Sequence, residues 1–67
     1  MTKNEAVHLQ FGQQLCPSQL AIRRGVLKSS DSGVFLRLTK TGLGLYIVKA
    51  GNVTVQTWSI NFWTALS

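Results

Sequence analysis

The chain has 67 residues, enough for one small domain, and its seven Lys and Arg against two Asp and Glu give a formal net charge of +5. Cys16 is the only cysteine and His8 the only histidine, which excludes an intramolecular disulfide and a Cys/His zinc set within one chain. A mechanism with paired carboxylates would need both acidic residues. We therefore expect a non-enzymatic protein with no cofactor, metal or small-molecule substrate.

The composition favours association with other molecules. Hydrophobic residues make up an ordinary 45% of the chain, whereas charged residues make up only 13%, about half the usual share. A chain this short hides only about 60% of the surface that its unfolded form exposes. We expect a homo-oligomer or a subunit of a larger assembly, and the positive charge also favours nucleic acid as a partner.

The N-terminal segment 1–6 is polar and is not followed by an apolar stretch of signal-peptide length, so secretion through a signal peptide is not expected. The longest apolar run, 45–48, is far too short to span a bilayer.

In the first third of the chain, Val7, Leu9 and Phe11 alternate with polar residues, which predicts a strand that ends at Gly12. Residues 13–20 are expected to be irregular, followed by a strand over 20–27. A short helix capped by Ser18 is the alternative.

The middle of the chain predicts a three-stranded antiparallel meander. A cluster of turn residues at 29–33 precedes alternating strands at 34–39, 43–48 and from 53 onward, with turns at 41–42 and 49–52. Leu43, Leu45 and Ile47 should share one face, opposite Tyr46 and Val48. The expected fold is all-β: one domain over residues 1–67, built as a small antiparallel meander, sandwich or partial barrel of four or five strands.

The C-terminal segment is apolar on both faces if it stays a regular strand. Val53 and Val55 have the opposite parity to Trp58, Ile60 and Phe62, so either a β-bulge near 56–57 aligns them or one face meets a partner. Core packing is one role for these side chains. The other is an interface with a partner or a second copy, for which the candidate residues are Trp58, Ile60, Phe62 and Trp63.

The densest basic group is Arg23 and Arg24 with Lys28. Arg and Lys bind phosphate oxygens, so these residues could contact nucleic acid or another anion, or could form a solvated edge. The candidate contact residues for nucleic acid are Arg23, Arg24, Lys28, Arg37 and Lys40.

Residues 44–55, Gly-Leu-Tyr-Ile-Val-Lys-Ala-Gly-Asn-Val-Thr-Val, resemble one repeat of a viral fibre shaft, the triple β-spiral. Leu45, Ile47, Gly51, Val53 and Val55 occupy the apolar and glycine positions of that repeat. Tyr46 and Val48 depart from it, since a shaft has polar residues there, and no second copy is evident. The resemblance implies a structural, trimeric homo-oligomer without catalytic activity.

These features together favour a non-enzymatic structural component of a viral or phage particle, located in the virion or the host cytoplasm, that packs through an apolar C-terminal strand. One alternative is a small nucleic-acid-binding barrel of the OB or SH3-like kind that uses the basic residues. Another is an inhibitor or adaptor that adds a strand to the sheet edge of a host protein.

Overall fold

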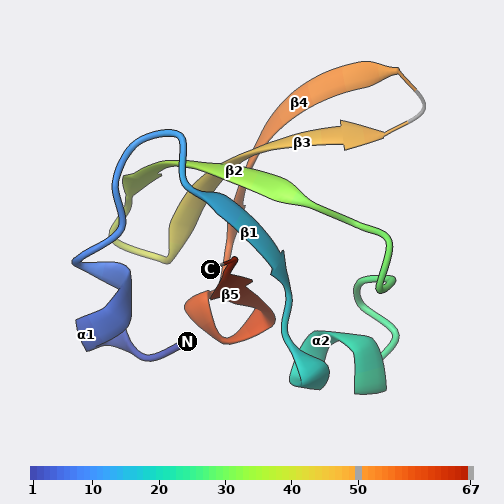
Figure 1. The fold of residues 1–67 in the computed structure, drawn as a ribbon, viewed down its shortest axis with the longest axis horizontal. Helices are drawn as coiled ribbons and strands as arrows, with labels where there is room; N and C mark the ends of the chain where they lie inside the picture. Colours follow the sequence, from blue (N-terminus) through green and yellow to red (C-terminus); the bar gives the residue numbers. More distant parts are fainter. Residues whose placement is uncertain (50, 67) are drawn as a thin grey trace.

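Five antiparallel strands form one open sheet in the order β4-β3-β2-β1-β5 (Figure 1). The structure is a computed structural model that describes residues 1–49 and 51–66. The strands are β1 (Gln14–Pro17), β2 (Gly33–Leu38), β3 (Leu43–Lys49), β4 (Asn52–Trp58) and β5 (Trp63–Ala65). The short helical segments are α1 (Lys3–Ala6), α2 (Gln19–Arg23) and the 3₁₀ helix η1 (Ile60–Phe62). The predicted all-β fold class is confirmed.

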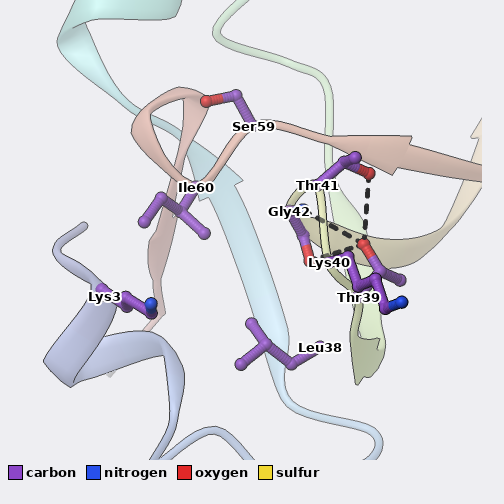
Figure 2. Close-up of a pocket in the computed structure, with 8 residues that line it drawn as sticks. All are labelled: Lys3, Leu38, Thr39, Lys40, Thr41, Gly42, Ser59 and Ile60. Atoms are coloured by element: carbon purple, nitrogen blue, oxygen red, sulfur yellow. Dashed lines mark hydrogen bonds between the residues drawn. The ribbon is translucent and has the colours of Figure 1, made fainter.

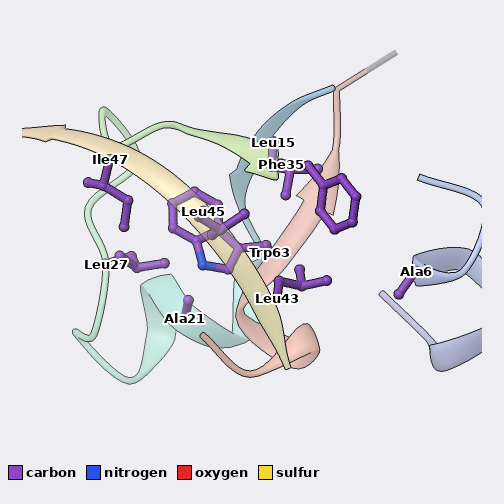
Figure 3. Close-up of a cluster of buried hydrophobic side chains, with 9 residues drawn as sticks. All are labelled: Ala6, Leu15, Ala21, Leu27, Phe35, Leu43, Leu45, Ile47 and Trp63. Carbon is purple, nitrogen blue, oxygen red and sulfur yellow. The ribbon is translucent and has the colours of Figure 1, made fainter. Parts of the chain in front are cut away.

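The hydrophobic core lies on one face of the sheet, between the strands and the helical segments (Figure 3). Trp63 of β5 is fully buried at its centre. A Cβ on Gly33 would lie 3.4 Å from two ring atoms of Trp63, so the bare glycine lets the indole rest against β2. The other buried apolar residues are Ala6, Leu15, Ala21, Leu27, Phe35, Leu43, Leu45 and Ile47.

The predicted meander is confirmed as β2, β3 and β4. Leu43, Leu45 and Ile47 are buried, whereas Tyr46 and Val48 are exposed, as the alternation predicts. The expected turn over 49–52 is seen in part: Lys49 pairs with Asn52, and Ala50 lies outside the described residues. The register of β2 against β3 shifts between Phe35 and Arg37.

The turn between β2 and β3 packs against the end of β4. Gly42 has φ +155°, and a Cβ there would overlap the carbonyl oxygen of Trp58. The Thr39 hydroxyl donates to the Gly42 carbonyl at 2.9 Å and accepts from the Gly42 N–H at 3.1 Å. Only glycine fits this position, because the side chain of any other residue needs the space that the β4 backbone occupies.

The predicted strand over 7–11 is wrong, because the chain begins with helix α1 and continues in turns. Thr2 and Glu5 form a capping box: the Thr2 hydroxyl accepts from the Glu5 N–H, and the Glu5 carboxylate accepts from the Thr2 N–H at 3.1 Å. The helix places Ala6 in the core and ends at Val7. Phe11 is left 79% exposed.

The predictions for residues 13–27 are also corrected. Residues 14–17 form β1, which pairs with both β2 and β5. A helix, α2, replaces the expected strand over 20–27, since Ser18 caps it by accepting from the Ala21 N–H at 3.3 Å. The alternative of a short helix starting after Ser18 is therefore confirmed.

The β-bulge near 56–57, one of the two alternatives for the C-terminal segment, is not present in β4. β4 pairs with β3 without a shift from Asn52 to Trp58, and the chain then leaves the strand at Ser59, the N-cap of η1. The chain returns as β5, which pairs with β1 at the other end of the sheet. Val53, Val55 and Trp58 thus belong to β4, where the two valines and Trp58 lie on opposite faces, whereas Ile60 and Phe62 belong to η1 and Trp63 to β5. The apolar C-terminal residues do not form a single strand.

Candidate functional site

The outer face of the sheet carries an exposed apolar patch on β3 and β4. Tyr46 pairs with Val55 and Val48 pairs with Val53, so all four side chains project from the same face. Their exposed fractions are 41%, 58%, 63% and 61% in that order. The core and the residues of α1, α2 and η1 that pack on it lie on the other face. We call Tyr46, Val48, Val53 and Val55 the outer patch.

Strand β4 forms one edge of the sheet, because β3 is the only strand among the described residues that pairs with it. Residues 52–57 are exposed and Trp58 is half-buried. The strand contains no charged residue and no proline, which are the usual means by which proteins prevent pairing at an edge. β4 is therefore open to another strand.

Two contacts show which backbone groups of β4 face outward. The Thr54 hydroxyl donates to the Ile47 carbonyl at 3.5 Å, and a Cβ on Gly33 would lie 3.4 Å from the Tyr46 carbonyl oxygen. The Tyr46 carbonyl is thus directed to β2 and the Ile47 carbonyl to β4. Because these directions alternate along a strand, Thr54 pairs its backbone with β3, whereas Val53 and Val55 direct their N–H and C=O groups to the free edge.

The opposite edge, β5, is shorter and partly occupied. The Phe62 carbonyl accepts from the Ser18 N–H on the β1 side, so the next carbonyl, that of Trp63, is directed away from β1. The Met1 ammonium group donates to this Trp63 carbonyl at 3.0 Å and to the Ile60 carbonyl at 3.2 Å. The two edges of the sheet therefore differ in length and in access.

The four residues predicted as a partner interface contact the protomer's own core. Trp58, Ile60 and Phe62 are half-buried against it, and Trp63 is fully buried. The Trp58 ring makes edge-to-face contacts with Phe62 and Trp63, at centroid distances of 6.4 and 6.0 Å. Trp63 cannot contact a partner in this fold, because no part of its side chain reaches the surface.

The predicted basic residues do not form one face. Arg23 and Arg24 belong to α2 and its C-cap, and Lys28 follows in the next loop. Lys40 lies in the β2–β3 turn, which Figure 1 shows at the other side of the molecule from α2. Arg37 lies over Gly44 of β3, since a Cβ on that glycine would be 3.4 Å from the Arg37 Cγ.

A pocket of about 210 Å³ lies between α1, the β2–β3 turn and Ser59 (Figure 2). Lys3 and Lys40 line it together with the hydroxyl residues Thr39, Thr41 and Ser59, and no lining residue is acidic. Ammonium and hydroxyl groups are donors that suit the oxygens of an anion. The sequence prediction included Lys40 but missed Lys3, which only the capped helix α1 brings close.

Both acidic side chains accept hydrogen bonds from nearby backbone N–H groups. The Thr2 backbone N–H and the Thr2 hydroxyl both donate to the Glu5 carboxylate and lower its pKa, and the backbone N–H has the larger effect. Asp31 accepts from the Lys28 N–H at 2.9 Å. Within the described residues, no three His, Cys, Asp or Glu side chains are grouped so as to hold a metal ion.

No protein-family model, no curated protein and no solved structure matches this chain. Among the described residues, no helix has the length and apolar character needed to cross a membrane.

Proposed function

We propose that this chain is a non-enzymatic assembly subunit that associates with other subunits through the hairpin β3–β4. The outer patch carries the proposal: two cross-strand pairs, Tyr46 with Val55 and Val48 with Val53, align four exposed apolar side chains on one face. Contiguous apolar surface of this kind marks an interaction site more often than isolated exposed residues do. The surface we propose thus lies on β3 and β4 rather than on the C-terminal residues expected from the sequence.

The low charge of the hairpin further supports self-association. Lys49, at the turn end of β3, is the one charged residue in the two strands, so two hairpins meet with little direct repulsion although each chain carries a net charge of +5. A repeated subunit of a viral or phage particle is the setting that we propose for this association.

Sedimentation velocity over a range of protein concentrations tests the proposal. We expect a species with a mass that is a multiple of 7.4 kDa. We expect the double variant Val48→Thr/Val53→Thr to shift it toward the monomer, because threonine keeps the shape of valine but has a hydroxyl in place of one methyl group. Val7→Thr is the matched control, since Val7 is 55% exposed and directly follows α1 as its C-cap, away from the hairpin in the fold. A wild-type protein that stays monomeric at every concentration overturns the proposal.

Binding to the phosphates of a nucleic acid is a second candidate function, favoured by the pocket that joins Lys3 and Lys40. The test is an oligonucleotide titration at two salt concentrations with the double variant Lys3→Gln/Lys40→Gln, and with Arg23→Gln/Arg24→Gln as the charge-matched control. Binding through the pocket must weaken with salt and must be lost in the lysine variant only. Equal loss in both variants means that net charge alone attracts the oligonucleotide.

A further inference from the structure

We propose that β4 pairs antiparallel with β4 of a second copy of this chain, with Val53 opposite Val55 of the second copy and Thr54 on the twofold axis. This pairing joins two five-stranded sheets into one. The inference rests on the proposed function and specifies how the subunits meet.

The outward groups of β4 fit this pairing. Val53 and Val55 direct their N–H and C=O groups to the free edge, as the contacts of Thr54 and Gly33 show, so they form the hydrogen-bonded pairs of the new ladder. Each of these valines gains an apolar cross-strand neighbour, and the outer patches of the two copies become continuous. Thr54 meets Thr54 of the second copy on the other face, which is a favourable cross-strand pair.

The absence of charge on β4 favours a second copy over a different protein. An acidic or basic partner strand finds no complementary side chain on residues 52–58. When two β4 strands pair, valine lies opposite valine and threonine lies opposite threonine, and no two like charges are brought together. The sequence of the strand is therefore self-complementary in this register.

The difference between the two edges limits association by strand pairing to a dimer. Pairing of β4 with itself uses the same surface on both copies, which is the property of a closed twofold contact. The edges left over are the two β5 strands, each three residues long and each with the Trp63 carbonyl bound by Met1. Further strands thus have little backbone to pair with.

Disulfide crosslinking tests the register. The variant Thr54→Cys in a Cys16→Ser background places two cysteines across a non-hydrogen-bonded pair with Cα atoms about 4.5 Å apart, within the range of about 4.4–6.8 Å that a disulfide requires. Gln56→Cys in the same background is the matched control, because it shares the face and exposure of Thr54 but would lie about 13 Å along the strand from its counterpart. We expect a covalent dimer of twice 7.4 kDa from the first variant and almost none from the second.

A second variant tests the backbone pairing without a new cysteine. Val55→Pro removes an N–H that is directed away from β3, so it should abolish the dimer while leaving the circular dichroism spectrum of the folded chain unchanged. Val55→Thr keeps this N–H, so it should weaken the dimer less than Val55→Pro does.

The outcomes separate this inference from the proposed function. A dimer of the wild-type chain that survives Val55→Pro and fails to crosslink at residue 54 overturns the β4 pairing but leaves the assembly function standing. A wild-type chain that stays monomeric overturns both the β4 pairing and the assembly function. Crosslinking at residue 56 as strong as at residue 54 also overturns the pairing, since it indicates random collision.

Discussion

Gly42 combines a backbone angle and a close contact that together exclude other residues. Its φ of +155° disfavours any L side chain, and a Cβ would overlap the carbonyl oxygen of Trp58. We predict that Gly42→Ala lowers the free energy of unfolding by well over 1 kcal/mol, more than the gain of about 0.4–1 kcal/mol that alanine gives where it fits. Gly25→Ala is the control, since Gly25 has φ +70° with no atom within 4 Å of the new Cβ. Urea denaturation should show a smaller loss for Gly25→Ala; equal losses would mean that the contact with Trp58 is unimportant.

Trp63 is buried with an unsatisfied hydrogen-bond donor. Its Nε1 has no partner among the described residues, and a buried unpaired donor costs about 1–3 kcal/mol. We predict that Trp63→Ala destabilises the fold by about 3–5 kcal/mol, whereas Trp63→Phe costs much less, because it keeps ring contacts near Gly33 and removes the unpaired N–H. Thermal unfolding of both variants measures the difference, and similar losses would contradict the prediction.

The elements that sequence reasoning predicted correctly are those with alternating side chains between clear turns. The strands over 34–39 and 43–48 show this pattern. β1 was missed because it has four residues and ends in Pro17, too few to show alternation, and α1 was missed because the apolar alternation over 7–11 outweighed a capping box at Thr2 and Glu5. Short elements fixed by tertiary pairing or by one cap leave little periodic signal.

Helix α1 should depend on pH through Glu5. The hydrogen bonds from Thr2 lower the pKa of Glu5 below its ordinary value of 4.5 in the folded chain, so the charged carboxylate stabilises the fold. This contribution is fully present above the ordinary value and is lost as the pH falls through the lowered pKa. We predict that the Thr2 and Ala6 amide signals in NMR spectra shift in that acidic range. Glu5→Gln cannot titrate at this position, and an identical shift in that variant would show that another group is responsible.

At the scale of the whole molecule, the sequence predicted the presence of an exposed apolar face but not its location. The alternation of side chains along β3 placed Tyr46 and Val48 on the face opposite the core. It left open whether the aromatic C-terminal residues lie in the core or on the surface. The end of β4 before Ser59 determines the answer, because the chain turns there and the C-terminal segment runs back across the core. The sequence also left open whether the candidate basic residues share one surface, and the fold separates Arg23 and Arg24 from Lys40.

Association through β4 predicts that stability depends on protein concentration. Only folded chains can pair through β4, so a higher protein concentration favours the dimer by mass action and raises the Tm. We expect the Tm of the wild-type chain to increase over a hundredfold concentration series and that of Val55→Pro to stay constant. Calorimetry at matched scan rates measures both, and a wild-type Tm independent of concentration contradicts the prediction.

The contact of Met1 with the carbonyl groups of Ile60 and Trp63 bears on how the chain is prepared for study. A fusion tag placed ahead of Met1 converts an ammonium group with three N–H donors into an amide with one, so at least one of the two carbonyl groups loses its hydrogen bond. Where the lost bond is that of Trp63, the freed carbonyl adds an acceptor to the β5 edge, and a sheet with two accessible edges can polymerise instead of closing. Fibres formed by a chain with residues ahead of Met1 would then grow through β5 as well as through β4.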